Sequence, residues 1–445
     1  MRLIPLFRSS ATAAPLLFLL TLTLIDRADA KRLFIATTGN DAVTYAENSQ
    51  AKPWKSVSKA FSEPKAGDTA CFMPGEYSIT AHIDQRSMGS HGTQTKRIII
   101  TSCTSDEALI VGSSSLDPVI DIEKDFHTVQ NLRFQGPGRF FRVGYDFTGT
   151  SAWFINLKIK MVKGGDNFGF IYIDGAVDPH MERCVVEGVY PSGSGTPNFS
   201  CGIIVFRGSG AKILRNEFHH MATGVYYKHA NTPVSPSNIE IAYNYIHHTD
   251  RFSMQLNCNY ASVHDNLMGA SNAQFFINDA NGVAGGDFNV FDHNTLYDCP
   301  LILQYQTEGG DPNPGAIKNT FRNNIFLKGA EFHRYSAVPH ASIAENNLYA
   351  PGSVIWENRI TYTLAAWKTK SAQEKNSFEG SPIYPVAASL LSATGIVPNF
   401  RLTSASPGYR KGTDGKDIGA DVGAVGPGVS TPINLDPSLY RSIAK

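Results

Sequence analysis

The stretches ILRNEFHH (213–220) and IAYNYIHH (241–248) are two versions of one phrase, in which an asparagine separates a short apolar run from alternating polar and apolar residues. Further copies carry their asparagine at Asn131, Asn156, Asn266, Asn294, Asn324 and Asn347, and one copy has Cys184 in that place. The copies recur at short and fairly even intervals along the chain. Within each copy the apolar residues alternate as in a strand and show no helical period. This recurrence predicts that each copy forms one coil of a parallel β-solenoid.

A second phrase follows each first one and has apolar residues at alternate positions, so that one face enters the coil and the other faces outward. The clearest examples are GFIYIDG (169–175), CGIIVFRG (201–208), TGVYYKHA (223–230), RFSMQLNC (251–258), AQFFINDA (273–280) and LILQYQT (301–307). Inserts rich in Gly, Pro, Ser and Asn separate the phrases, as at 190–199 and 229–238. Such inserts predict loops that project from a rigid body, where function usually lies.

The repeated asparagine itself is interpreted as structural. An Asn at the same turn of every coil stacks its amide on the next one, satisfies buried backbone groups and tolerates a left-handed conformation.

The two ends of the chain differ from its middle. Residues 1–30 read as a signal peptide, with Arg2 and Arg8 before the apolar run 15–25 and a small-x-small site at 28–30. Beyond it no apolar run approaches the roughly 20 residues that a bilayer requires. We therefore expect a secreted or periplasmic protein with no membrane span, whose β-helix occupies residues 31–350. Residues 351–445 lack the Asn period and are expected to form capping strands and loops of the same body.

Charge and cysteine content narrow the partners. The chain has 39 basic and 39 acidic residues, so it lacks the overall positive charge that nucleic-acid binding requires. A polyanionic substrate would have to meet a local cluster of charge or a metal ion. The six cysteines could pair in an exported chain or remain as buried thiols, and none has zinc-type CxxC spacing. No serine-hydrolase, zincin, NTPase or dehydrogenase motif occurs in a supporting context.

The opening of the mature chain carries a family resemblance. FIATTGNDA (34–42), AKPWKSVSKAF (51–61) and AGDTACFMPGEY (66–77), together with the Asn-punctuated repeats, resemble the secreted right-handed parallel β-helix proteins of carbohydrate metabolism. The style is closest to pectate lyases of the ninth lyase family and to related uronate-polymer lyases, over most of residues 33–350. The resemblance implies an all-β, right-handed parallel β-helix of roughly ten rungs, with residues 56–61 as an N-terminal capping helix.

By the same resemblance, the strand of the second phrase floors a substrate groove with its outer face. Placing Val225 and Tyr227 inward puts Tyr226 and Lys228 outward. Aligned in this way, one polar ladder contains Asp174, Arg207, Lys228, Asn257 and Asn278. Further predicted substrate contacts are Tyr226, His229, Gln255 and Gln304. Two alignments stay open, because Arg207 and Asp174 fall at the Lys228 position or one residue beyond it, and a slip of one residue exchanges the two faces.

The ladder suits β-elimination from a uronate polymer. That reaction requires a base that is neutral at working pH and a cation or strong donor on the carboxylate. Lys228 is the predicted base, with its pKa depressed by Arg207 and partial burial, and Arg207 or a calcium ion would meet the carboxylate. The alternative is that both are ordinary solvated groups.

Calcium is the one cofactor considered, and its ligands are not assigned. The aspartate cluster of the ninth lyase family has no clean match in this chain. Only scattered acidic candidates remain, at Asp166, Asp174, Asp279, Glu308 and Asp311.

Histidine pairs give a second candidate surface. His219–His220 and His247–His248 occupy equivalent positions in successive copies of the first phrase and are predicted to lie one above the other. Stacked imidazoles could bind a metal, act as acid and base, or serve only as ladder packing. Neighbouring side chains predicted to face outward, and suited to stacking on sugar rings, are Arg215, Tyr243, Tyr245, His293 and Tyr297.

The sequence therefore predicts a monomeric, secreted polysaccharide lyase that cleaves an acidic, uronate-containing polysaccharide, with no nucleic-acid or membrane partner. Three alternatives stay open. A glycoside hydrolase on this fold would need two facing carboxylates. A uronate C5-epimerase is suggested by Asp178-Pro179-His180, which resembles the start of the DPHD signature of alginate epimerases but continues with Met181. A non-catalytic carbohydrate-binding solenoid would need only the aromatic face.

Overall fold

The computed structural model describes most of the chain between residues 30 and 428. The described ranges are 30–104, 107–145, 151–165, 168–189, 200–228, 237–279, 286–298, 301–307, 318–327, 331–334, 343–357, 360–385 and 400–428. Residues 1–29 of the predicted signal peptide and the residues 190–199 and 229–236 lie outside them.

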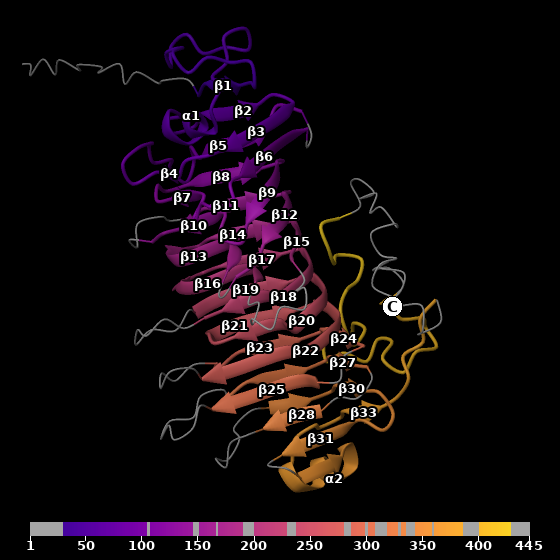
Figure 1. Ribbon diagram of the computed structural model, residues 1–445. Coiled ribbons are helices and arrows are strands. Elements are labelled where there is room, and N and C mark those ends of the chain that lie inside the picture. The colour runs from indigo at the N-terminus through magenta and orange to yellow at the C-terminus, as the bar shows by residue number, and fades with distance from the viewer. Residues whose placement is uncertain are drawn as a thin grey trace, which may run out of the picture.

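The described residues form a right-handed parallel β-helix, as the sequence predicted (Figure 1). Each coil contributes in turn to three sheets that run the length of the molecule. Sheet 1 contains β1 (Arg32–Ile35), β2 (Thr69–Phe72), β5 (Ile98–Ser102), β8 (His127–Gln130), β11 (Trp153–Ile155), β14 (His180–Glu182), β17 (Lys212–Leu214), β19 (Ser237–Ala242), β21 (Asn259–His264), β23 (Val290–Asp292), β26 (Thr320–Arg322) and β29 (Ile343–Glu345).

Sheet 2 follows sheet 1 in each coil. It contains β3 (Gly75–Ile79), β6 (Ala108–Gly112), β9 (Arg133–Pro137), β12 (Lys158–Lys163), β15 (Val185–Glu187), β24 (Thr295–Tyr297), β27 (Ile325–Phe326), β30 (Leu348–Tyr349) and β33 (Phe378–Glu379). Sheet 3 contains β4 (Ile83–Asp84), β7 (Ile120–Ile122), β10 (Phe141–Val143), β13 (Gly169–Val177), β16 (Cys201–Ser209), β25 (Leu301–Thr307), β28 (Glu331–Arg334), β31 (Val354–Glu357) and its neighbour β32 (Ile360–Thr363). Three long strands bend from sheet 2 into sheet 3, namely β18 (Glu217–Tyr227), β20 (Tyr245–Leu256) and β22 (Leu267–Asp279).

Pairing is parallel throughout the described strands except between β31 and β32. The inward side chains of all three sheets form one apolar cluster along the axis of the coil. Phe134, Phe141, Phe154 and Phe170 are fully buried there and contact one another edge-on or tilted, with ring centroids 5.0 to 6.4 Å apart. Alternation of apolar and polar residues therefore places the core as the sequence predicted.

A ladder of buried asparagines lines the turn from sheet 1 to sheet 2. Its members, all 0% exposed, are Asn216, Asn244, Asn266, Asn294, Asn324 and Asn347. Each side-chain oxygen accepts from the backbone N–H of the preceding member, as Asn244 Oδ1 does from Asn216 at 2.9 Å. Cys184 continues the ladder, since its N–H donates to Asn216 Oδ1 at 2.9 Å. The structural interpretation of these asparagines is thus confirmed.

Asn131 and Asn156 do not belong to this ladder, which corrects the alignment made from the sequence. In their coils Leu132 and Leu157 occupy the inward column. The carbonyl of each leucine accepts a backbone N–H from the next coil, and the carbonyl of Cys184 makes the equivalent hydrogen bond one coil further along. Asn131 and Asn156 instead have φ of 53° and 51° and occupy the outward, left-handed position, where the Asn156 amide donates to Asn131. Asn tolerates this conformation, so the same residue type suits both adjacent positions.

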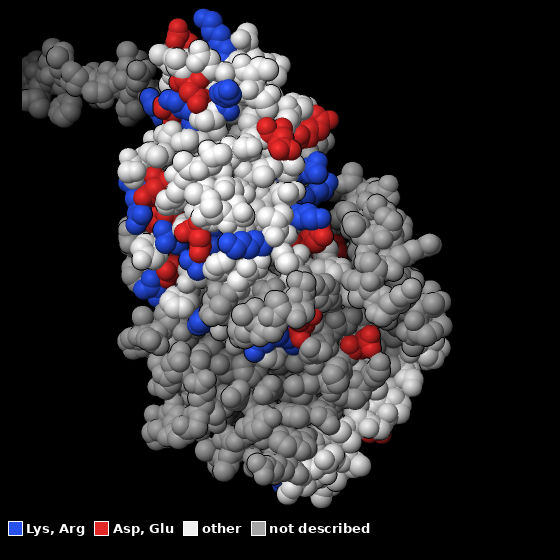
Figure 2. Space-filling view, in the orientation of Figure 1, with Lys and Arg blue, Asp and Glu red and all other residues white. Residues whose placement is uncertain are grey.

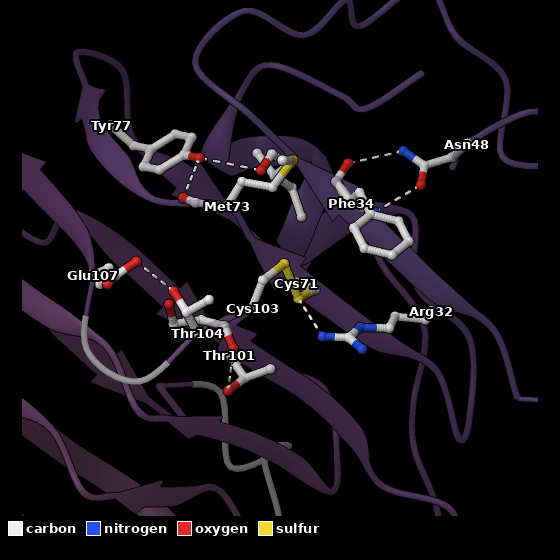
Figure 3. The surroundings of a disulfide bond; sticks show 12 residues. Arg32, Phe34, Asn48, Cys71, Met73, Tyr77, Thr101, Cys103, Thr104 and Glu107 are labelled. Atoms are coloured by element: carbon white, nitrogen blue, oxygen red, sulfur yellow. Dashed lines mark hydrogen bonds between the residues drawn. A yellow bond between two sulfur atoms is a disulfide. The ribbon is translucent and has the colours of Figure 1, made fainter. Parts of the chain in front are cut away.

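At the N-terminal end, the helix α1 (Val57–Ser62) begins after Ser56, whose side chain accepts from the Lys59 N–H, and buries Phe61 in the core cluster. A disulfide joins Cys71 of β2 to Cys103, which follows β5, so it connects neighbouring coils of sheet 1 (Figure 3).

The remaining described cysteines form no disulfide. Cys184, Cys201 and Cys258 are buried, and burial raises the pKa of Cys184 to about 12. The chain therefore contains both a bridge and buried thiols, the two uses of cysteine that the sequence left open. Cys299 lies outside the described residues.

Parallel pairing continues past residue 350, through β28–β31 and β30–β33. The helix α2 (Leu364–Ser371) follows, and residues 400–428 then run back along the coil (Figure 1). In this segment Phe400, Val422 and Val425 pack against Tyr245 and Tyr297 on the outer face of sheet 2. Among the helices that the structure describes, none is long and apolar enough to span a membrane.

Candidate functional site

The predicted site lies on the outer face of sheet 3, where Arg207 of β16 is paired with Asp174 of β13. Nε of Arg207 donates to Oδ1 of Asp174 at 2.6 Å, and Nη2 lies 2.5 Å from the same oxygen. Asp174 is 4% exposed, and its burial raises the pKa of the carboxyl while the ion pair with Arg207 acts in the opposite direction. Asp174 is thus a buried group that positions Arg207, whose side chain is 22% exposed.

Lys228 lies on the next coil, immediately after β18. Val225 and Tyr227 are fully buried in the core, and Tyr226 and Lys228 are half-buried, as the predicted alternation requires. The backbone N–H of Lys228 donates to the carbonyl of Val205 at 2.8 Å, which places Lys228 beside Phe206.

A β-bulge explains the alignment that the sequence left open. Ile173 pairs with Val205, but Asp174 pairs with Arg207, so Phe206 is an extra residue in β16. Arg207 therefore lies one residue beyond the position opposite Lys228, which was one of the two alignments considered. The predicted five-residue ladder therefore divides into two parts that are offset at this bulge. One part is Asp174 with Arg207, and the other is Lys228 with Asn257 and Asn278.

Phe206 brings the two cations together. Its ring centroid lies 6.0 Å from Nζ of Lys228 and 5.9 Å from Cζ of Arg207, so both cationic groups lie beside the same ring. A cation within about 6 Å of an aromatic ring is attracted by its quadrupole. Phe206 was not among the residues predicted from the sequence, because alternation alone assigns no role to the extra residue of a bulge.

The other predicted substrate contacts have different surroundings. Gln255 pairs with Tyr226 on the outer face, and both are half-buried. Asn257 donates its N–H to the Tyr227 carbonyl and is only 1% exposed. It is therefore buried beside Lys228, whereas the sequence predicted a side chain open to solvent.

The last three predicted contacts cannot be placed as side chains. His229 lies outside the described residues, and for Asn278 and Gln304 the structure describes only the strands that carry them, β22 and β25.

Sheet 3 carries further charge pairs that the sequence analysis missed. Asp121 of β7 is 0% exposed and accepts from Nε and Nη2 of Arg142 at 2.8 and 2.6 Å. Arg86 pairs with Asp84 at 2.8 Å one coil earlier. Figure 2 shows acidic and basic side chains alternating along the edge where Figure 1 labels β4, β7, β10 and β13. The sequence feature that marks these pairs is a charged residue between two apolar ones, as in Ile120-Asp121-Ile122.

No calcium ligands are assigned among the described residues. They contain no group of three or more His, Cys, Asp or Glu side chains arranged to bind a metal ion. Of the scattered candidates, Asp174 already faces Arg207. Asp166, Glu308 and Asp311 lie outside the described residues, as does the side chain of Asp279. We therefore assign no chemistry to calcium.

The histidine pairs stack on neighbouring coils as predicted. The His219 and His247 rings lie 5.3 Å apart and nearly parallel, and so do those of His220 and His248. Within each pair the Nδ1 atoms approach to 2.7 and 2.6 Å, so one ring donates and the other accepts. Burial lowers the pKa of His219 to about 3 and that of His220 to about 4. Burial thus favours the neutral form of the stacked imidazoles, and Nε2 of His247 lies 3.2 Å from the Glu217 carboxyl.

The predicted aromatic surface is covered. Tyr245 and Tyr297 are each 3% exposed beneath Phe400, Val422 and Val425, and their hydroxyls lie 3.1 Å apart. The expectation that these rings stack on sugars is therefore wrong for the described structure. No periodic signal in the repeats reveals that residues 400–428 fold back over them.

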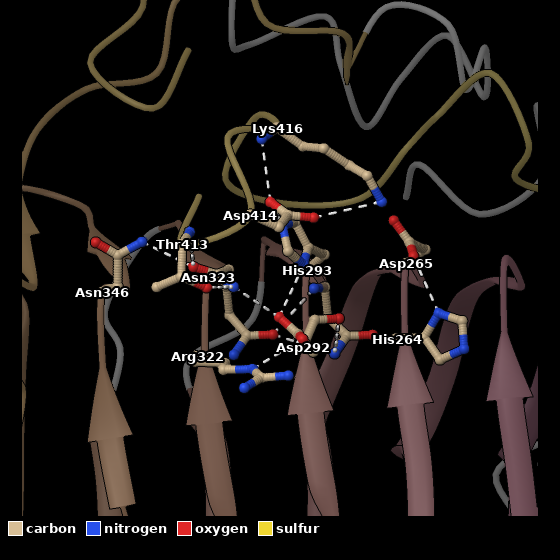
Figure 4. A network of polar contacts seen from close by, with 12 residues as sticks. His264, Asp265, Asp292, His293, Arg322, Asn323, Asn346, Thr413, Asp414 and Lys416 are labelled. Atoms are coloured by element: carbon tan, nitrogen blue, oxygen red, sulfur yellow. Dashed lines mark hydrogen bonds and ion pairs between the residues drawn. The ribbon is translucent and has the colours of Figure 1, made fainter. Parts of the chain in front are cut away.

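The same C-terminal segment docks on a polar network at the turn after sheet 1 (Figure 4). Nδ1 of His293 lies 2.7 Å from Asp292, and Nε2 lies 3.3 Å from Asp414 of the docking segment. Asn323 donates to Asp292 and to Thr413. A cavity of about 560 Å³ lies beside this network, between residues 401–422 and His293.

The network makes a prediction about pH. Burial lowers the pKa of His293, but Asp292, Asp414 and Asp265 raise it above the usual value, while Arg322 and Lys416 contact the same carboxylates. A raised histidine pKa stabilises the fold below the unfolded-state pKa of about 6.5, and this contribution disappears as pH rises through the folded-state pKa. Asp414→Asn should therefore lower the melting temperature by about 1–2 °C at pH 5 and not measurably at pH 9.

Thermal unfolding at both pH values checks this, and the difference between them isolates His293, because the contact of Asp414 with Lys416 is lost at either pH. Asp417→Asn is the control, because Asp417 accepts from the Arg410 N–H and faces no histidine in the described network. An equal loss of stability by Asp414→Asn at pH 5 and pH 9 would contradict the role of His293.

Comparison with known proteins places this geometry on a known fold. No protein-family model and no curated protein matches the chain. Pectate lyase Pel9A superposes with a TM-score of 0.56 at 14% identity, covering 87% of this chain and 95% of that one. XylC in complex with xylose gives a TM-score of 0.53 at 11% identity, with 78% and 82% covered. A mannuronic acid specific family 6 lyase from human gut microbiota gives 0.46 at 11% identity, with 74% and 82% covered.

The first two of these likenesses show the fold. The chain is a pectate-lyase-like right-handed parallel β-helix, and the resemblance inferred from its sequence is confirmed at the level of the fold. One of the two is a pectate lyase.

Proposed function

We propose that this protein is a secreted polysaccharide lyase that cleaves an acidic, uronate-containing polysaccharide by β-elimination on the outer face of sheet 3. The observation that carries the proposal is the approach of Lys228 and Arg207 to one side chain, Phe206, with Arg207 fixed by the buried Asp174. A proton acceptor and a fixed cation are the two groups that this elimination requires.

The proposed reaction begins at the C5 proton next to the uronate carboxylate. Lys228, in its neutral form, takes this proton, and Arg207 stabilises the enolate that develops there. The electron pair then forms a C4–C5 double bond as the C4–O4 bond breaks. The glycosidic oxygen leaves with a proton that a water molecule or a neighbouring acid supplies. One product has a new non-reducing end with an unsaturated uronate.

The experiment is incubation with a panel of uronate polymers, with the near-ultraviolet absorbance of the unsaturated product as the measurement. An increase supports the lyase. New reducing ends without that absorbance would identify a hydrolase, and an altered uronate composition at constant chain length would identify an epimerase. Binding with no chemical change on any polymer would leave the non-catalytic solenoid.

Among the alternatives, the hydrolase has the least support in the described part of sheet 3. Asp174 and Asp121 are buried and paired with arginines, so neither is an open carboxylate facing a substrate. A hydrolase needs one carboxyl group as acid and a second as base or nucleophile.

Arg207→Ala gives a separate prediction. Loss of the guanidinium that binds the substrate carboxylate should weaken binding of the ground state and of the transition state together. On a uronate polymer KM should rise and kcat/KM should fall about 10²- to 10³-fold. Because the substitution leaves Asp174 buried without Arg207, it should be measured beside the double variant Asp174→Asn/Arg207→Ala.

The matched control is Arg183→Ala. Arg183 is exposed at the turn after sheet 1, and its ion pair with Glu182 is long, at 3.5 Å. Steady-state kinetics on the polymer that the wild type cleaves check the prediction. Wild-type kcat/KM in the folded double variant would contradict a role for Arg207.

A further inference from the structure

A second charged surface lies on the outer face of sheet 2, away from Lys228. There a cavity of about 210 Å³ extends over β6, β9, β12 and β15 and reaches His219 of β18. Its charged lining residues are Arg133, Lys158, Lys160 and Glu187. None of them takes part in the site proposed above.

The cavity carries an excess of positive charge. Arg133 and Lys158 are direct partners in the parallel pairing of β9 with β12, where neighbouring strands lie about 4.8 Å apart. Like charges directly opposite each other destabilise a sheet. Arg133 is exposed and makes no hydrogen bond or ion pair with a residue in the described ranges. The register of β9 and β12 therefore places two basic side chains next to each other on the same outer face.

One carboxylate accompanies three cations. Lys160 pairs in register with Gln135 on one side and Glu187 on the other, and its Nζ lies 3.4 Å from Glu187. With His219 neutral through burial, the charged side chains of the lining are three cations and one carboxylate, a composition that complements an anionic ligand.

The cationic pair is flanked by apolar side chains. Leu109, Arg133, Lys158 and Val185 form one column across four strands, in the order apolar, cation, cation, apolar. Leu109 and Val185 are half-buried and so present apolar surface beside the charges. A uronate sugar has the matching chemistry, because its ring has an apolar face and its rim carries a carboxylate.

The surface ends where the C-terminal segment begins to cover sheet 2. Further along the sheet, Tyr245 and Tyr297 are buried by Phe400 and Val422. Figure 2 shows blue side chains on the flank where Figure 1 labels β9, β12 and β15. Among the described residues, the strip from β6 to β15 is thus a part of the outer face that the segment 400–428 does not cover.

We propose that this strip, formed by Leu109, Arg133, Lys158, Lys160 and Val185, is a non-catalytic binding site for an acidic polysaccharide chain. The sugar class rests on the proposed function, and the site itself does not. It would retain the protein on its polymer while another segment of polymer reaches sheet 3.

The experiment is affinity electrophoresis in native gels that contain alginate or polygalacturonate, with dextran sulfate and a neutral polymer in parallel gels. All variants carry Lys228→Ala, so that turnover does not affect retention. Arg133→Ser/Lys158→Ser should raise the apparent Kd for the uronate polymer about tenfold. Lys52→Ser/Lys55→Ser, which removes the same charge from exposed positions near the N-terminal end, should leave it unchanged.

Two results would overturn the proposal. One is retention of the Arg133→Ser/Lys158→Ser variant equal to that of the control variant. The other is an equal loss of retention on dextran sulfate, which would show general attraction of polyanions. Arg133→Gln/Lys158→Gln serves as a second pair if the serine variant does not fold. Absence of any cleaved polymer would refute the lyase and leave this retention measurement valid.

Discussion

Lys228→Ala should abolish turnover of the uronate polymer while the fold stays intact. General-base catalysis contributes about 10²- to 10⁴-fold to a rate, so kcat should fall by at least that lower bound. The side chain lies on the outer face, and the core residues that precede it in the alternation, Val225 and Tyr227, are unchanged. Lys228→Arg should not restore activity, because a guanidinium is far harder to deprotonate at neutral pH.

Initial rates of unsaturated-product formation measure this effect, with melting temperature as the check on folding. Lys212→Ala is the matched control, since Lys212 is an exposed lysine of β17 on sheet 1. If the Lys228→Ala enzyme turns over close to the wild-type rate, the base is another residue. Asp250 would be examined next, because burial raises the pKa of its carboxyl to about 6 on the strand that also carries Gln255.

The fold could be predicted because its main determinants are local and repeated. Every coil has a turn between sheets 1 and 2. From Asn216 onward a buried asparagine amide hydrogen-bonds the backbone of that turn, so Asn recurs in the inward column. The misassigned Asn131 and Asn156 show the limit of this signal. They occupy the adjacent left-handed position, which also favours Asn, and a motif search cannot separate two neighbouring positions with the same preference.

The candidate site could be predicted only in part, because its geometry depends on features without a period. The bulge at Phe206 shifts Arg207 by one residue relative to Lys228, and nothing in CGIIVFRG marks the extra residue. The burial of Asn257 and the covering of Tyr245 likewise depend on segments far away in the sequence or on packing around them. Alternation predicts which way a side chain points and does not predict what lies over it.

The buried asparagine ladder should be the most sensitive structural element of the chain. Nδ2 of Asn266 donates to the carbonyls of Ile241 and His264 and to Asn294, and its Oδ1 accepts from the N–H and Nδ2 of Asn244 at 3.0 and 2.9 Å. Asn266→Ala would leave several of these groups buried without partners. Each such group costs about 1–3 kcal/mol, so the free energy of unfolding should fall by about 4 kcal/mol or more.

The matched control is Asn156→Gly in the outward column. Asn156 makes one side-chain hydrogen bond, to Asn131 at 2.8 Å, and glycine accepts its φ of 51° without strain. Its loss should cost about 1 kcal/mol or less. Urea unfolding of both variants measures the difference. Equal destabilisation would mean that water replaces the amide of Asn266, and the ladder would then not stabilise the coil through its chain of hydrogen bonds.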